Sequence, residues 1–231
     1  MRTPILFIHG AATGPTVWTG VVSALFGLFN AQGLPTPELR APKRPQHGDW
    51  DEEIDALSSA ASGAFIVGVS GGATLGWELL SSRYRSNAPA IPVGGILHEP
   101  AAGSLAPGLL SHVAQALSAQ GLAGFGKALY SESWTPALAS IDDAGVALEF
   151  AMFSRFEPTA LRVPDAVLLT TGTDSPTLRH SSVTRLSETY GVPRSMIPGK
   201  HAVHLDHAQD FARAVFEQYL AVTGSQVPPR A

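Results

Sequence analysis

Short apolar runs alternate along the chain with longer segments of helical periodicity, and this alternation restricts the fold more than any other feature. The runs Ile5-Leu6-Phe7-Ile8, Phe65-Ile66-Val67 and Val167-Leu168-Leu169 are continuous, as in strands that are buried on both faces of a parallel sheet. The pattern predicts an α/β fold with a mostly parallel sheet of about six strands and helices on both faces. We expect strands at 4–9, 36–41, 64–69, 92–98, 166–171 and 193–198, and helices at 15–31, 51–62, 71–86, 176–190 and 207–222.

The composition excludes several classes of protein. The 231 residues contain no cysteine, so a disulfide framework, a thiolate nucleophile and a sulfur-ligated zinc site are excluded. With 15 Lys and Arg against 19 Asp and Glu, and no run of like charge, the chain is not expected to bind nucleic acid. It has no apolar stretch of about 20 residues and no export signal, so no membrane association and a cytoplasmic location are expected. A small molecule is the expected partner, and the oligomeric state is left open.

Residues 101–163 interrupt the alternation, because they contain apolar residues at helical spacing but no convincing strand. An insertion of this size predicts a helical cap over the sheet, within one domain that spans residues 1–231. The alternative is a set of helices that extends the core. The end of the chain, 224–231, has no apolar period and is expected to be a flexible tail.

The sequence Gly68-Val69-Ser70-Gly71-Gly72 follows one predicted strand and opens the next helix. This is the context in which the pattern G-x-S-x-G forms a sharp turn that lifts a serine hydroxyl above the sheet. Small residues at 68 and 72 let strand and helix approach each other. The helix N-terminus favours developing negative charge, so the Gly71 amide is a natural oxyanion donor. The alternative is that Ser70 serves only as a helix N-cap.

A serine nucleophile needs a base, and the base needs a group that orients it. His201 lies between the last predicted strand and the last helix. Asp174 follows the strand at 166–171. Both residues therefore fall at the carboxyl edge of the sheet, on the side of Ser70, and the chain order is Ser…Asp…His.

These motifs together resemble the α/β-hydrolase superfamily over nearly the whole chain. His9-Gly10-Ala11-Ala12 is similar to the family's HG turn, Gly68 to Gly72 to its nucleophile elbow, and Gly172 to Pro176 to its acid turn; His201 to His207, followed by Phe211, resembles the catalytic-histidine loop and closing helix. The resemblance implies that Ser70 is the nucleophile, His201 the base and Asp174 the orienting acid, with the amides of Ala11 and Gly71 as oxyanion donors.

The chain departs from the family pattern in three respects. The sequence starts almost at the HG strand, so the family's usual leading strands are expected to be missing. The loop around 44–48 matches only loosely, and Gly71 stands where a larger residue is often found. Some members place the acid one strand earlier, and here Glu99 ends that earlier strand. We favour Asp174 over Glu99, because its turn is the better match to the triad order.

Other residues have competing interpretations. Ala12, Trp134 and Phe153 are candidates for substrate binding, and the alternative for the two aromatic residues is ordinary packing within the cap. His201, His204 and His207 also suggest a metal site. The third of these would turn away on a helix and no second cluster of ligands lies upstream, so neither a metal nor a cofactor is expected.

The leading hypothesis is a cofactor-independent serine hydrolase that cleaves a small, largely apolar carboxylic ester, thioester or lactone through an acyl-enzyme. Relatives with this fold also carry out carbon–carbon bond hydrolysis, lyase chemistry or cofactor-free oxygenation, so another type of reaction is the second hypothesis. A non-catalytic protein that binds a small molecule is the third.

Overall fold

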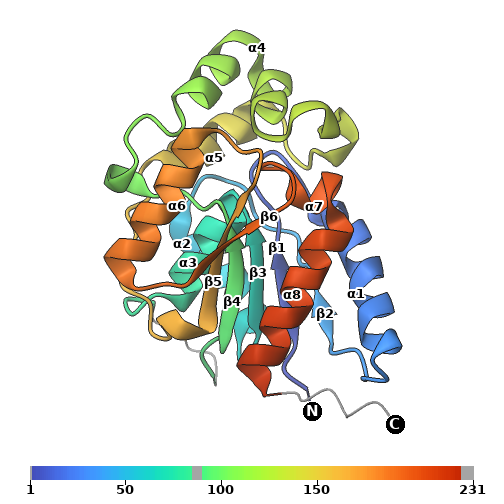
Figure 1. Cartoon of the computed structure of the whole chain (residues 1–231). Helices are drawn as coiled ribbons and strands as arrows, with labels where there is room; N and C mark the ends of the chain where they lie inside the picture. Colours follow the sequence, from blue (N-terminus) through green and yellow to red (C-terminus); the bar gives the residue numbers. More distant parts are fainter. Residues whose placement is uncertain (1, 85–89, 225–231) are drawn as a thin grey trace.

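The computed structural model describes residues 2–84 and 90–224, which fold around a six-stranded parallel sheet (Figure 1). The strand order is β2-β1-β3-β4-β5-β6, and every neighbouring pair is parallel. The strands match the six predicted segments; the four inner strands are buried, as expected for apolar runs inside a parallel sheet, whereas the two edge strands are partly buried or exposed over most of their length. They are β1 (Ile5–Ile8), β2 (Leu39–Arg40), β3 (Phe65–Val69), β4 (Gly94–His98), β5 (Val167–Gly172) and β6 (Arg194–Ile197).

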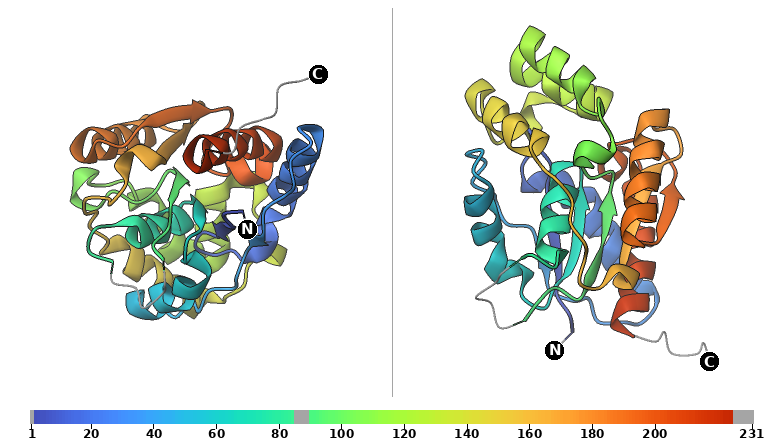
Figure 2. Two further views of the ribbon diagram at one scale, coloured as in Figure 1. Left: turned by 90° about the horizontal axis from the view of Figure 1, so that it is seen from below. Right: turned by 90° about the vertical axis from the view of Figure 1, so that its left-hand side faces the viewer.

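Helices cover both faces of this sheet (Figure 2). Alternate residues of the strands point to opposite faces, and they divide the core into two clusters. One cluster joins Phe7 and Phe65 of the strands to α1 (Thr19–Ala31) and α8 (Ala208–Thr223). The other joins Leu6, Ile8 and Ile66 to the helices of the opposite face, which are α2 (Trp50–Ala61), α3 (Gly71–Leu80) and α6 (Thr177–Tyr190).

Two helix predictions need correction. The helix predicted over 71–86 ends at Leu80, and residues 85 and 86 lie outside the described part of the chain. The cause is a long-range contact, because Ser82 N donates to Ala160 O and Arg162 N donates to Leu80 O. A short helix that was not predicted, α7 (Val203–Asp206), precedes α8.

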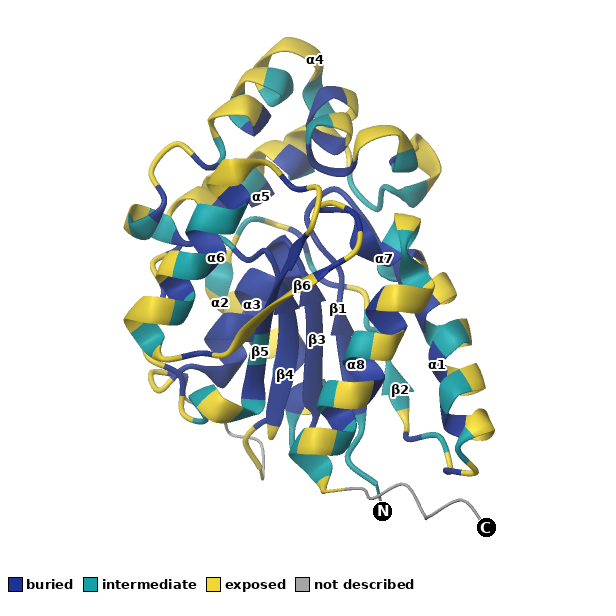
Figure 3. Ribbon diagram, in the orientation of Figure 1, coloured by how far each residue is buried: buried dark blue, intermediate teal, exposed yellow. Residues whose placement is uncertain are grey.

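Residues 101–163 form helices that lie above the carboxyl edge of the sheet, at the top of Figure 1. The two main helices are α4 (Ser111–Tyr130), which is kinked at Gln120 and Gly121, and α5 (Asp143–Ser154). They cover the buried ends of the strands (Figure 3). We call the segment 101–163 the cap. Short 3-10 turns complete the fold: η1 (Pro15–Trp18), η2 (Gly103–Leu105), η3 (Ser131–Ser133), η4 (Pro136–Leu138) and η5 (Pro164–Ala166).

The sequence predicts a flexible tail at 224–231 and no membrane association. Residues 225–231 of the predicted tail lie outside the described range. Within that range, the longest and most apolar helices still fall short of what is needed to cross a membrane.

Candidate active site

Ser70 occupies a tight turn between β3 and α3. Its φ of 58° and ψ of −125° are unusual for a residue with a side chain, and such strain is typical of a nucleophile elbow. The flanking glycines are required by space: a Cβ on Gly72 would collide with the Ile8 carbonyl, and one on Gly68 would lie 2.5 Å from the Gly72 carbonyl oxygen. The Ser70 side chain makes no capping hydrogen bond to α3, so the geometry does not support a role as an N-cap alone.

His201 lies in the loop after β6, and its orienting partner is Glu99. The imidazole Nδ1 is 2.7 Å from the Oε2 atom of Glu99, and both side chains are buried. The other carboxylate oxygen of Glu99, Oε1, accepts hydrogen bonds from the Gly172 amide at 3.0 Å and from the Ser175 hydroxyl. The carboxylate can only accept, so Nδ1 of His201 carries the hydrogen and Nε2 is left as an acceptor. That Nε2 is buried and has no hydrogen-bond partner among the described residues.

Asp174 does not take the predicted place beside His201. Its side chain is exposed, and only its backbone is tied down, through a 2.8 Å hydrogen bond from its amide to the Gly199 carbonyl. The correction has a topological reason. Glu99 follows β4, the direct neighbour of β3, and its φ of 47° turns the chain sharply at the end of the strand. The turn after β5 contributes Gly172 and Ser175 as donors to Glu99 instead of supplying the acid.

Electrostatics keep this pair in the form that general-base catalysis requires. Burial lowers the pKa of His201 to about 4, and the nearby Arg179 acts in the same direction, although Glu99 opposes both. Burial alone would raise the pKa of Glu99, but His98, the hydrogen bond from His201 and Arg179 together hold it well below its usual range. At neutral pH the pair is therefore a carboxylate and a neutral imidazole.

The two predicted oxyanion donors lie side by side. A Cβ built on Gly71 would stand 3.1 Å from the Ala11 amide nitrogen and 2.7 Å from the Phe153 ring. Gly71 opens α3, and the first amides of a helix have no partner within it. Two backbone N–H groups next to the serine make a cradle for developing negative charge.

Side chains of the cap hold the turn that carries the Ala11 amide. The Tyr130 hydroxyl donates to the Ala11 carbonyl at 2.9 Å, and Trp134 Nε1 donates to the Ala12 carbonyl at 3.2 Å. The Ala12 amide in turn donates to Glu149 Oε2 at 3.1 Å. Trp134, one of the predicted substrate contacts, therefore fixes the turn and does not line the cavities described below, and the same holds for Ala12.

A buried arginine ties the same turn to the core. Arg44 pairs with Glu53 of α2 at 2.7 Å and with Glu149 of α5 at 2.6 Å, and none of these three side chains is exposed. It also donates to the carbonyls of His9 and Gly10, each at 3.2 Å. Because Arg44 meets two carboxylates, its pKa is raised despite the opposing effect of burial. We call Arg44, Glu53 and Glu149 the buried ion network.

Tyr130 is a further residue that the sequence did not indicate. Its ring stacks on that of His201 with centroids 5.8 Å apart. Its hydroxyl also lies within hydrogen-bonding range of Ser70, although burial is the largest influence on its pKa and raises it. Tyr130 thus lies beside Ser70, His201 and the turn that carries the Ala11 amide.

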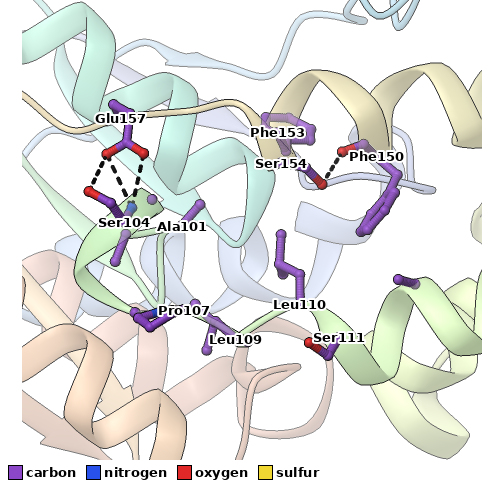
Figure 4. Close-up of a pocket in the computed structure, with 15 residues that line it drawn as sticks. Ala101, Ser104, Pro107, Leu109, Leu110, Ser111, Phe150, Phe153, Ser154 and Glu157 are labelled. Atoms are coloured by element: carbon purple, nitrogen blue, oxygen red, sulfur yellow. Dashed lines mark hydrogen bonds between the residues drawn. The ribbon is translucent and has the colours of Figure 1, made fainter.

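Three cavities lie near the carboxyl edge of the sheet, and Ser70 is in the wall of the smallest. A small chamber of about 30 Å³ has Ala11, Ser70, Gly71, Glu99 and Arg179 in its wall, together with apolar side chains of the cap. Phe153, the third predicted substrate contact, lines both this chamber and a cavity of about 390 Å³ between the loop 101–110 and α5 (Figure 4). A third space of about 380 Å³, which we call the His201 cavity, is bounded by α4, the start of α6 and the loop at 200–202.

The three histidines of the alternative metal site do not form one. His204 is buried against Trp18, with ring centroids 5.1 Å apart, and burial lowers its pKa to about 3. His207 instead lies 3.5 Å from Asp210 on α8. Within residues 2–84 and 90–224, no three His, Asp or Glu side chains gather in an arrangement suited to a metal ion.

Comparisons with known proteins support the fold described above. A sequence model of the alpha/beta hydrolase family matches residues 5–214, whereas no curated protein sequence matches significantly. A thermophilic esterase from Thermogutta terrifontis, in a malate-bound structure, has a TM-score of 0.71 at 15% identity, covering 96% of this chain and 91% of the esterase. An enol-lactonase from Burkholderia xenovorans LB400 has a TM-score of 0.68 at 16% identity, with 96% and 92% covered.

A pyrethroid hydrolase from Sphingobium faniae JZ-2 is similarly close, with a TM-score of 0.66 at 17% identity, covering 96% of this chain and 98% of that one. At such identities, the solved structures establish a shared fold. The family model covers most of the chain, including the elbow, Glu99 and the start of the last helix. The chain belongs to the alpha/beta hydrolase family.

Proposed function

We propose that this protein is a serine hydrolase that cleaves a carboxylic ester, thioester or lactone through a covalent acyl-enzyme. The observation that carries the proposal is the pairing of a buried, neutral His201 with Glu99 at 2.7 Å, at the same sheet edge as the strained Ser70 elbow. Similar solved structures include proteins described as an esterase, an enol-lactonase and a pyrethroid hydrolase, which supports reaction at an ester-like carbonyl.

The first half of the reaction forms the acyl-enzyme. Nε2 of His201 accepts the proton of the Ser70 hydroxyl as Oγ attacks the carbonyl carbon. The carbonyl oxygen becomes an oxyanion and is held by the amides of Ala11 and Gly71. Glu99 stabilises the imidazolium that forms. When the intermediate collapses, His201 passes its proton to the departing alkoxide or thiolate.

The second half repeats this chemistry with water. His201, neutral again, accepts a proton from a water molecule that attacks the acyl carbon. The same two amides hold the second oxyanion, and the proton returns to Ser70 as the acid product leaves. The narrow chamber above Ser70, walled in part by apolar side chains of the cap, strengthens each of these electrostatic contacts by limiting the access of bulk water.

A fluorophosphonate probe tests the proposal, because it reacts covalently with an activated serine. We expect labelling of Ser70 alone, identified by mass spectrometry of the digested protein, and turnover of p-nitrophenyl esters that disappears in Ser70→Ala. A folded protein that ignores the probe and hydrolyses no ester would contradict the proposal. Activity retained by a folded Ser70→Ala variant would contradict it equally.

A further inference from the structure

The structure contains two buried arginines whose partners differ sharply. Arg44 uses four of its five N–H groups, two on carboxylates and two on backbone carbonyls. Arg179, in the first turn of α6, is also buried, but its only charged contact is from Nε to Glu99 Oε2 at 3.4 Å. No hydrogen bond from its guanidinium is present in the described part of the chain. Four further N–H groups, those on its two Nη atoms, are therefore available.

The position of Arg179 shows where these donors point. Its side chain lines both the small chamber above Ser70 and the His201 cavity, and so lies at their boundary. None of its nitrogens is among the completely enclosed polar atoms that lack a partner, so the guanidinium borders open space. A buried cation with free donors beside a reactive serine is an expensive arrangement unless a ligand anion completes it.

Glu99 does not supply that anion by itself. Its two oxygens already accept from Gly172, Ser175 and His201. Burial lowers the pKa of Arg179, and Glu99 only partly offsets this, whereas the pKa of Arg44 is raised by its two carboxylates. Further out, the His201 cavity carries Lys200 as well as Asp174 and Asp206, so its rim has no excess of positive charge. Of the two arginines that are buried in the described part of the chain, Arg179 is the one whose donors are uncompensated.

We propose that Arg179 binds a carboxylate of the substrate, so that the preferred substrate is an ester that carries a free carboxylate near its reacting carbonyl. This proposal rests on the hydrolase function above and names its class of substrate. A planar carboxylate matches the planar guanidinium in a bidentate pair, and its single charge matches the single arginine better than a phosphate dianion does. Apart from Ser70, Thr74 and Glu99, the rest of the chamber wall is apolar, which suits a short hydrocarbon link between carboxylate and ester.

Matched pairs of substrates test the proposal. Monophenyl esters of malonic, succinic, glutaric and adipic acids carry a carboxylate, and phenyl esters of unbranched fatty acids with the same number of heavy atoms do not. We expect the best carboxylate ester to have a kcat/KM at least tenfold above its neutral partner. In Arg179→Met the kcat/KM for this ester should fall about 100-fold, while the kcat/KM for the neutral ester should change less than threefold. Arg179→Lys should recover part of the lost kcat/KM.

Arg185→Met is the matched control, because Arg185 lies on the same helix but is exposed and donates to the Leu105 carbonyl. This substitution should leave kcat/KM unchanged for both esters. All comparisons are made on the pH-independent plateau, because removing Arg179 also alters the pKa of His201. Equal rates for both esters, a preference for the neutral one, or an equal loss on both in Arg179→Met would overturn the proposal. The last result would assign Arg179 to the support of Glu99 and His201.

Protection of Ser70 gives a readout that needs no turnover. Free glutarate and adipate should slow fluorophosphonate labelling of the wild-type protein but not of Arg179→Met, whereas the corresponding diamides should slow neither. Absence of protection in the wild type would overturn the carboxylate site while labelling itself still supports the hydrolase. If Ser70 is not labelled at all, the hydrolase function fails, and the substrate class fails with it.

Discussion

Replacing Arg44 by Met removes the centre of the buried ion network. The change leaves Glu53 and Glu149 without their cation and breaks the hydrogen bonds to the His9 and Gly10 carbonyls. Removing one partner of a buried ion pair costs about 3–5 kcal/mol, because the remaining charge is left uncompensated. Here two carboxylates lose their partner at once, so we expect the free energy of unfolding to fall by about 4 kcal/mol.

Equilibrium unfolding in urea measures this loss. With a denaturant dependence of about 2–3 kcal/mol per molar urea, the midpoint should fall by about 1–2 M. Arg40→Met is the matched control, because Arg40 also pairs with a glutamate, but Glu38 is largely exposed. Exposed pairs contribute little, so the control midpoint should move by less than a third as much. Arg44→Lys keeps one charge but cannot meet all four acceptors, and should fall between wild type and Arg44→Met.

Substitution of Arg44 should also slow catalysis, because the network holds the turn that carries the Ala11 amide. Loss of an oxyanion donor costs about 10²–10³ in kcat, and a loosened donor should cost roughly a tenth of that. We expect kcat of Arg44→Lys, assayed in the absence of urea where it is folded, to fall tenfold or more with KM nearly unchanged. A midpoint shift no larger than that of Arg40→Met would refute the energetic reasoning. An unchanged kcat would refute the link between the network and the oxyanion turn.

Three further predictions follow from the site. The acid limb of the pH profile of kcat/KM should have an apparent pKa near 4 and not 6.5, because burial and Arg179 lower the pKa of His201. Arg179→Met should move this apparent pKa upward. A wild-type limb at pH 6.5, over the pH range where circular dichroism shows a folded protein, would contradict this prediction. The free energy of unfolding should be highest above about pH 6.5 and should fall below that pH by up to about 1.4 kcal/mol per pH unit for each buried histidine. The reason is that folding lowers the pKa of four buried histidines: His9, His98, His201 and His204. Equal urea midpoints at pH 7.5 and 5.5 would disprove this. Gly71→Ala should reduce kcat/KM at least tenfold, because the added Cβ would stand 2.7 Å from the Phe153 ring. Adding Phe153→Leu should restore part of the loss. An unchanged kcat/KM in Gly71→Ala would mean that residue 71 and the Phe153 ring are not in contact.

The sheet was predictable from sequence because its signal is local. The inner strands β1, β3, β4 and β5 are short apolar runs, and turn or helical segments separate them, so their parallel arrangement follows from the alternation itself. The end of α3 was not predictable, because Ser81 and Ser82 are tied to residues 160–162, which are remote in sequence. Local patterns carry no information about such a partner.

The site divides in the same way. Ser70, Gly71, His201 and Ala11 stand in motifs with their own spacing, and the structure brings all four to one edge of the sheet. The choice between Asp174 and Glu99 depends on how two neighbouring strands end in space, which no spacing records. The sequence did contain a signal for Glu149 and Arg179, because each is a charged residue on the apolar face of its helix. Glu149 shares that face with Val146 and Phe153, and Arg179 shares it with Val183 and Leu186. A charged side chain at such a position is rarely buried unless it has a partner or a function.

The structure departs from the sequence prediction at the acid of the proposed triad, and this residue provides the most direct test. Glu99→Gln and Asp174→Asn each remove one negative charge and keep the shape of the side chain. We expect the first to lower kcat for a neutral ester by roughly 10³–10⁴, because His201 loses the partner that fixes its tautomer, and the second to change kcat less than threefold. A large loss in Asp174→Asn together with a nearly unchanged kcat in Glu99→Gln would contradict the account.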